Sequence, residues 1–267
     1  MSTRVLGIVF QKGGSGKTTT AINLAAAFAG RGQPTLLIDY APQASATTGL
    51  GADPAALAKT VKDMILAQDR GQPLPLDTIL ATADDRLNIL PADITLSQLD
   101  TLLGPGGERV LAALVKSLVA LGRWNWIVID SPPNLGLGTL SVLLAARELL
   151  IPAHVHYFAQ TQLPQLFATL DTVQRRYDTH WNRIALVPTM FEANTTVSTA
   201  ALAYLDREYG EYLSAVRVRK NVAVVNAQAA GKPVQWYSPH CAAAEDYEAL
   251  AKEILASARQ PKEVAVS

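Results

Sequence analysis

Short apolar runs alternate along the chain with longer segments in which apolar residues recur every three or four positions. The runs Val5–Phe10, Thr35–Asp39 and Trp124–Asp130 are apolar and β-prone, which is typical of strands buried on both faces. After the first run, apolar residues follow a helical period from Ala21 to Phe28, and glycines then end the pattern. This alternation predicts an α/β fold, a doubly wound and mainly parallel sheet flanked by helices.

The same pattern continues to the end of the chain. Further strands are expected at 87–91, 148–152 and 183–188, with an edge strand at 215–218. Helices are expected at 107–121, 138–146, 163–177, 199–208 and 243–258. Without repeats or a convincing linker, residues 1–258 are expected to form one domain, followed by a flexible tail at 259–267.

Composition narrows the class of protein. The chain has 267 residues, of which 49% are apolar and 17% charged, and its formal net charge is zero. Any DNA binding must therefore come from a local basic patch and not from a global field. No apolar run approaches the roughly 18 residues of a membrane span, and no signal peptide is expected. The single cysteine, Cys241, excludes an internal disulfide, and a cytoplasmic protein is expected.

A glycine-rich loop joins the first strand to the first helix. It reads Lys12, Gly13, Gly14, Ser15, Gly16, Lys17, Thr18 and Thr19. The glycines leave room for backbone N–H groups to turn around phosphate oxygens. Lys17 can then reach the β- and γ-phosphates of a nucleotide, and the Thr18 hydroxyl can ligate Mg²⁺. The loop therefore predicts a site for ATP and Mg²⁺ at a helix N-terminus.

This loop departs from the general phosphate-loop pattern, because Gln11 occupies the place of the first glycine and Lys12 adds a second lysine. It resembles the deviant Walker A loop of the ParA/MinD family of ATPases. Residues 35–51 resemble the second strand and switch segment of ParA-type proteins, and Trp126–Pro133 resembles their Walker B strand. Weaker similarities at 186–191, 231–234 and 246–251 extend the resemblance over most of the chain.

The resemblance implies roles for several residues. In the family, Lys12 reaches the ATP of a partner subunit, so ATP is expected to favour a sandwich homodimer. Thr18 is expected to ligate Mg²⁺ directly, Asp130 to hold it through water, and Asp39 to order the same shell. Gln43 either contacts the partner subunit or shapes a turn.

Ala41 breaks the family pattern. ParA-type proteins carry Asp-x-Asp-Pro-Gln in the switch segment, and the second aspartate positions the attacking water. A methyl group accepts no hydrogen bond from water, so strong ATP binding with poor hydrolysis is expected. The alanine is either an engineered change that traps the ATP state or the mark of a naturally slow ATPase. The intact surroundings favour the first origin.

The ParA resemblance also implies nonspecific DNA binding in the ATP state, nucleoid association, and release by a ParB-type activator. The candidate DNA patch is Arg217, Arg219 and Lys220, with both arginines on one face of the expected edge strand. An ordinary solvated charge run is the alternative for these residues.

Three other functions remain open on the sequence. The chain could position a protein cargo on the nucleoid, cycle on a membrane as MinD does, or act as an ATP-switched binding protein without turnover. Membrane cycling needs an amphipathic C-terminal helix, and the tail at 260–267 contains Pro261 and no aromatic residue. No membrane partner is therefore expected.

Overall fold

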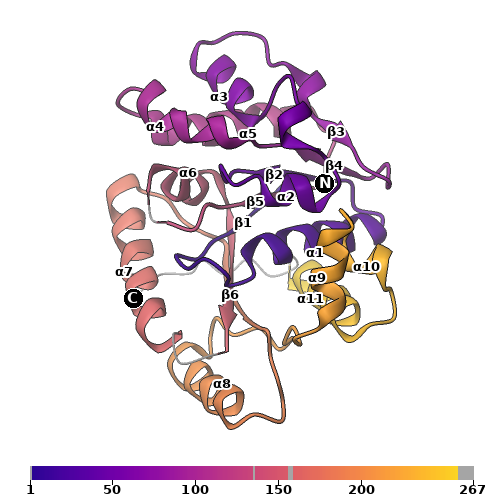
Figure 1. The fold of residues 1–267 in the computed structure, drawn as a ribbon. Helices are drawn as coiled ribbons and strands as arrows, with labels where there is room; N and C mark the ends of the chain where they lie inside the picture. The colour runs from indigo at the N-terminus through magenta and orange to yellow at the C-terminus, as the bar shows by residue number, and fades with distance from the viewer. Residues whose placement is uncertain (1, 135, 156–158, 258–267) are drawn as a thin grey trace.

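The strands form one seven-stranded sheet in the order β3-β4-β2-β5-β1-β6-β7, and only β3 runs antiparallel to its neighbour (Figure 1). The computed structural model describes residues 2–134, 136–155 and 159–257. The strand bounds are β1 Arg4–Ile8, β2 Thr35–Asp39, β3 Leu80–Ala81, β4 Leu87–Leu90, β5 Trp126–Asp130, β6 Glu148–His154 and β7 Arg183–Thr189. The expected parallel α/β fold is confirmed.

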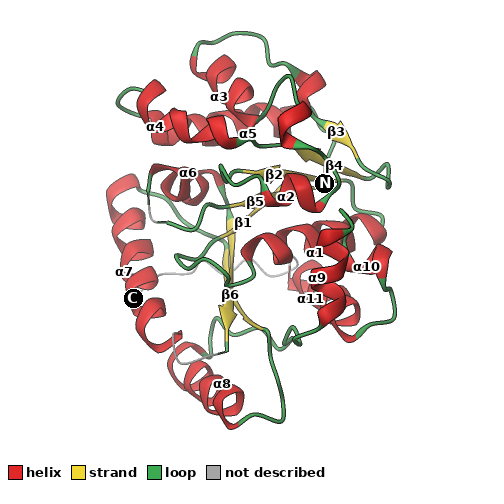
Figure 2. Cartoon of the chain, in the orientation of Figure 1, coloured by secondary structure: helices red, strands yellow, loops and turns green. Residues whose placement is uncertain are grey.

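Helices link these strands and cover both faces of the sheet (Figure 2). The α-helices are α1 Lys17–Gly30, α2 Ser45–Gly49, α3 Val61–Asp69, α4 Leu99–Leu102, α5 Val110–Ala120, α6 Leu137–Ala145, α7 Ala159–Tyr177, α8 Thr196–Tyr209, α9 Val222–Ala229, α10 Val234–Tyr237 and α11 Ala242–Ser257. Short 3-10 helices occur at Pro54–Ala56, Leu76–Thr78, Ile94–Gln98 and Gly107–Arg109.

Two apolar cores lie on opposite faces of the sheet. One joins α1 to α9, α10 and α11, and within it the rings of Phe28 and Trp126 stack at 4.2 Å between centroids. The other core holds the apolar residues of α3, α5, α6, α7 and α8. The central strands β2 and β5 are buried at every position, since helices cover them on both sides.

The expected edge strand at 215–218 does not form. This segment lies beside β7, but only single bridges join Leu213 to Leu186 and Arg219 to Phe191. Pro188 of β7 accepts a hydrogen bond from Val218 N through its carbonyl but has no N–H to continue a ladder. The prediction of a strand is therefore wrong.

The sequence pattern also left α9 and α10 without an assignment. The helix α9 begins at an asparagine cap, where the Asn221 side chain accepts a hydrogen bond from Ala223 N. The expected terminal helix is present as α11, while the tail at 259–267 lies outside the described residues. No helix in the described ranges is long and apolar enough to cross a membrane.

Candidate nucleotide site

The glycine-rich loop lies at the carboxyl end of β1 and leads directly into α1. Gly14 and Gly16 have φ angles of 74° and 90°, in the left-handed region that favours glycine. A Cβ built on Gly13 or Gly14 would meet no atom within 4 Å, so the loop faces open space. This backbone can turn its N–H groups toward an anion at the start of α1.

Lys17 occupies the first turn of α1 and is buried. Its ammonium donates a hydrogen bond of 3.1 Å to the Lys12 carbonyl, which holds the side chain back along the loop. Burial lowers the pKa of Lys17, and the charge of Asp130 opposes this shift. Lys12 itself is half-buried at the base of the same loop.

Asp130 ends β5 and pairs in register with Ile8 at the end of β1, the strand that leads into the phosphate loop. Its carboxyl group is fully buried, and neither oxygen has a hydrogen bond of normal geometry in the described part of the chain. Burial raises the pKa of Asp130 to about 8, and the neighbouring Asp39 adds to the shift, while Thr18 and Lys17 oppose it. A buried carboxylate that lacks hydrogen bonds of normal geometry is the kind of group that a cation would satisfy.

Asp39 lies next to Asp130, because β2 and β5 pair these two residues in register. Its carboxylate accepts hydrogen bonds from Ala41 N at 3.2 Å, Thr47 N at 2.9 Å and Thr47 Oγ1 at 2.8 Å. Burial raises the pKa of Asp39, although the Thr47 donors oppose the shift. This carboxylate therefore fixes the switch segment 39–51 to the end of β2. The role of Asp39 in the metal shell stays a prediction.

A cavity of about 190 Å³ opens between the phosphate loop, the switch segment and the end of β5. Its lining is formed by Gly13, Gly14, Gly16, Lys17, Thr18, Thr19, Ala41, Gln43, Ser45, Ser131, Pro133 and Gln228. Ala41 is 5% exposed and presents only a methyl group to this space. The structure thus brings together six loop residues with Ala41 and Gln43, as the sequence predicted. The lining does not include the predicted site residues Lys12, Ser15, Asp39 and Asp130.

Several lining residues escaped the sequence reading. Ser45 and Ser131 follow the two acidic motifs, and their adjacency to those motifs was the available signal. Gln228 comes from α9, more than two hundred positions after the loop, and no local pattern pointed to it. Tertiary packing of α9 against α2 places it there.

Two non-glycine residues near the cavity adopt left-handed backbone. Ala44, with φ of 51°, precedes α2, and Met190, with φ of 52°, follows β7. Beside Met190, Thr189 Oγ1 donates a hydrogen bond of 3.2 Å to the Ser15 carbonyl in the phosphate loop. Backbone of this kind is strained and is often found at functional sites.

The candidate DNA patch lies outside this cavity. Arg217 and Arg219 are exposed on either side of the buried Val218, so the alternation expected of a strand persists without the strand. The Arg219 guanidinium forms an ion pair with Asp246 at 2.7 Å, and Lys220 Nζ lies 3.3 Å from a Glu192 oxygen. Arg217 lies over the Phe191 ring at 5.4 Å. Two of the three cations are therefore partly neutralised.

The residues present fit a nucleotide with a divalent cation. Among the described residues no group of three or more His, Cys, Asp or Glu side chains gathers in a metal-binding arrangement. A magnesium ion here would therefore depend on phosphate oxygens together with the Thr18 hydroxyl and Asp130, which is the ligand pattern that Mg²⁺ prefers.

Comparisons with known proteins agree with this geometry. A family model described as AAA domain matches residues 3–183. The sporulation initiation inhibitor protein Soj of Bacillus subtilis is 34% identical over 255 residues, which cover 95% of this chain and 99% of Soj. The chromosome partitioning protein ParA of Caulobacter vibrioides is 33% identical over 258 residues, which cover 96% and 95% of the two chains.

Solved structures show the same fold. A crystal structure of cobyrinic acid a,c-diamide synthase from Mycobacterium smegmatis with bound ADP and magnesium has a TM-score of 0.80 and 28% identity, covering 98% of both chains. The cell division ATPase MinD of Pyrococcus furiosus has a TM-score of 0.76 at 24% identity, covering 95% of this chain and 98% of MinD. With the loop, the switch segment and the strand-end aspartates in place, the chain belongs to the ParA/MinD family and is a ParA-type ATPase.

Proposed function

We propose that this ATPase forms an ATP-dependent sandwich dimer, binds DNA without sequence preference, and segregates DNA together with a ParB-type activator. The observation that carries the proposal is the cavity that the phosphate loop forms with Ala41 and Gln43 of the switch segment. The buried carboxyl group of Asp130 lies close enough to Lys17, which lines this cavity, to oppose the lowering of its pKa. The names of the relatives, chromosome partitioning protein among them, support the same process.

The chain's own groups would hold the nucleotide. Backbone N–H groups of residues 13–19 and the Lys17 ammonium would bind the phosphates, and Lys12 would act on the nucleotide of the second subunit. Thr18 and Asp130 would hold Mg²⁺, which supplies neutralising charge to the phosphate oxygens. A similar solved structure has ADP and magnesium bound, which supports a nucleotide with this metal.

Ala41 would leave the ATP state long-lived. Two carboxylates lie nearby, but neither would position the attacking water. Asp39 already accepts hydrogen bonds from Ala41 and Thr47, and Asp130 would hold the metal. No carboxylate at position 41 is then left to orient a water molecule for in-line attack on the γ-phosphate. The chain would hydrolyse ATP slowly while it binds the nucleotide well.

Binding to nonspecific duplex DNA tests the proposal. Fluorescence anisotropy is measured with Mg–ATP, with Mg–ADP and without nucleotide, each at low and high salt. Tight, ATP-dependent binding that weakens with salt is expected, since phosphate contacts release counterions. Absence of binding in the ATP state would overturn the DNA role.

Two substitutions locate the DNA patch. Arg217→Ala removes an exposed cation that has no ion pair among the described residues, so it is expected to weaken DNA binding by up to about tenfold. Arg70→Ala, at the exposed end of α3, is the matched control and is expected to leave binding unchanged. Equal binding by both variants would remove Arg217 from the interface.

A further inference from the structure

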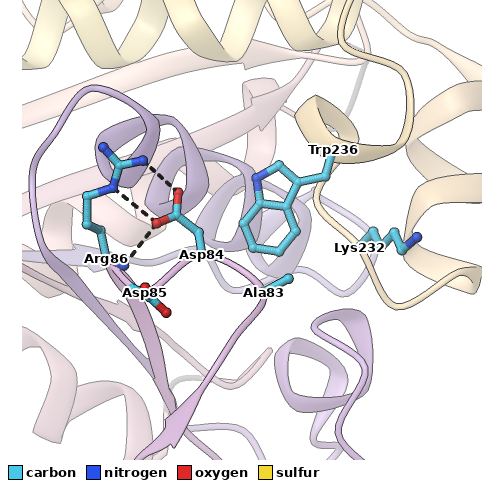
Figure 3. A pocket seen from close by; sticks show the side chains of 6 residues that line it. All are labelled: Ala83, Asp84, Asp85, Arg86, Lys232 and Trp236. Carbon is cyan, nitrogen blue, oxygen red and sulfur yellow. Dashed lines mark hydrogen bonds and ion pairs between the residues drawn. The ribbon is translucent and has the colours of Figure 1, made fainter.

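A second and larger cavity, of about 780 Å³, lies outside the nucleotide site. It lies between the turn joining β3 to β4 and the segment leading from α9 into α10 (Figure 3). Its lining residues are Ala83, Asp84, Asp85, Arg86, Lys232 and Trp236. None of them lines the nucleotide cavity, so the hollow is a separate feature of the surface.

One wall of this hollow contains a charge pair that is already satisfied. The Arg86 guanidinium contacts the Asp84 carboxylate through Nε at 3.1 Å and Nη2 at 3.2 Å. The backbone N–H of Arg86 adds a third hydrogen bond, of 2.9 Å, to the same carboxylate. In Figure 3 dashed lines join these two side chains, so the pair shapes the wall without offering a net charge.

Two charges in the hollow remain without an ion pair in the described part of the chain. Asp85 lies on the β3–β4 turn and Lys232 on the opposite wall, and both are exposed. A ligand that satisfies both must therefore carry a positive group toward one wall and a negative group toward the other.

Trp236 lies between these walls in Figure 3, above Ala83. Its side chain is half-buried, and it packs against the core beneath α1. Its indole N–H meets no acceptor among the described residues, and an aromatic face of this kind attracts cations. The hollow thus offers an aromatic face, one hydrogen-bond donor and two charges of opposite sign.

We propose that this hollow binds an extended, mixed-charge peptide segment of a partner protein. A basic side chain of the peptide lies on Trp236 and reaches Asp85, while an acidic side chain reaches Lys232. The hollow is open and four of its six lining residues are charged, whereas small-molecule sites are mostly enclosed and have few charged groups. Nucleic acid is disfavoured, because its phosphates would meet Asp84 and Asp85.

The peptide site is connected to the nucleotide site through α1. Asn23 of α1 donates a hydrogen bond of 2.7 Å to the Thr19 carbonyl, and Thr19 lines the nucleotide cavity. The same side chain accepts a hydrogen bond of 2.7 Å from Val234 N, and the Gln235 amide donates to the Asn23 carbonyl. Trp236 follows Gln235 directly. A shift of Thr19 on nucleotide binding can therefore reach Trp236 through Asn23 and two further hydrogen bonds.

A second connection runs through the switch segment. Gly231, beside Lys232, lies so close to Gly51 that a Cβ on Gly231 would stand 2.7 Å from the Gly51 Cα. Both glycines have left-handed backbone, with φ of 64° and 84°. Movement of the switch segment therefore displaces Lys232 directly, and Mg–ATP is expected to change peptide affinity about fivefold or more.

Synthetic peptides test the site on the full chain. The probe is a short fluorescein-labelled Gly/Ser peptide with one arginine and one glutamate, compared with peptides that carry only one of the two. Anisotropy is expected to show saturable binding that is strongest for the mixed-charge peptide. Trp236→Leu is expected to weaken it about tenfold and Asp85→Asn about threefold to fivefold. Asp69→Asn, at another exposed aspartate, which lies at the end of α3, is the matched control.

Several outcomes would overturn the proposal. They are the absence of saturable binding, equal binding by Asp85→Asn and the parent chain, or equal binding of the arginine-only peptide. If Trp236→Leu fails to fold by circular dichroism, Trp236→Phe and the exposed Asp85→Lys replace it. The titration without nucleotide requires neither ATP binding nor DNA binding, so its failure is distinguishable from failure of the proposed function.

Discussion

The ends of β2 and β5 carry the same chemical group in the same position, yet the two groups have different surroundings. Asp39 and Asp130 are register partners, and both are fully buried. Asp39 accepts three hydrogen bonds from the switch segment, whereas Asp130 has none of normal geometry in the described ranges. The two carboxylates therefore differ in their hydrogen-bond partners and not in position or burial. Asp39 holds the backbone of the switch segment, and Asp130 remains available to a cation.

The largest expected effect follows from adding a third carboxylate beside this pair. Ala41→Asp restores a group that can orient water, so ATP turnover is expected to rise about a hundredfold or more. The new side chain would be buried near Asp39 and Asp130, so the nucleotide-free protein is expected to melt at a lower temperature. Phosphate release and thermal melting measure both effects.

Ala41→Asn serves as the matched control for that change. It has nearly the same size and no charge, so it is expected to leave turnover close to that of the parent chain. Unchanged turnover in Ala41→Asp would show that another step or group limits hydrolysis.

Removing the Asp39 carboxylate is expected to have the next largest effect. Asp39→Ala leaves the Thr47 N–H and hydroxyl without their acceptor, and about 3 kcal/mol of unfolding free energy is expected to be lost. Asp93→Ala removes a comparable but partly exposed turn contact to Thr95 and is expected to lose only about 1 kcal/mol. Urea denaturation compares the two, and similar losses would contradict an anchoring role for Asp39.

Replacing Asp130 is expected to stabilise the nucleotide-free protein, whereas replacing Asp39 is expected to destabilise it. Because its pKa of about 8 lies above the ordinary value of 3.8, the folded chain holds this proton more tightly than the unfolded chain. The stability of the nucleotide-free protein is therefore expected to fall as pH rises from the unfolded value of 3.8 to about 8, and to level off above it. Asp130→Asn removes this charge and is expected to melt about 2–4 °C higher than the parent chain above pH 8.

The same variant should lose most of the stabilisation that Mg–ATP gives to the parent chain, since binding to the folded state is what raises its melting temperature. Melting curves at pH 6 and pH 9, with and without Mg–ATP, separate the two effects. A constant difference between the chains at both pH values would contradict the proton linkage.

The smallest expected effect concerns the strained turn between the anchor and α2. Ala44→Gly relieves a left-handed alanine but adds entropy to the unfolded chain, so a net gain of about 0.5 kcal/mol is expected. Ala46→Gly, in ordinary helical backbone of α2, is expected to destabilise the chain. Denaturant midpoints measure both, and a loss for Ala44→Gly would mean that the conformation is not strained.

Local patterns were sufficient to predict the six parallel strands, the phosphate loop and α1, because apolar runs and glycine spacing carry that information within a few residues. They missed the two-residue antiparallel strand β3. The same patterns failed at 215–218, where Pro188 of another strand prevents a ladder. They also missed Gln228 in the cavity and Thr47 as the partner of Asp39, since tertiary packing determines both contacts. The ion pair of Arg219 with Asp246 likewise joins distant segments.

The placement of Trp236 gives the chain a built-in optical reporter. Of its four tryptophans, Trp124, Trp126 and Trp181 are at most 3% exposed, and Trp236 alone is half-buried. A collisional quencher such as acrylamide should therefore reach mainly the indole of Trp236. The unlabelled protein can then signal, through its intrinsic fluorescence, when the larger cavity opens or is covered.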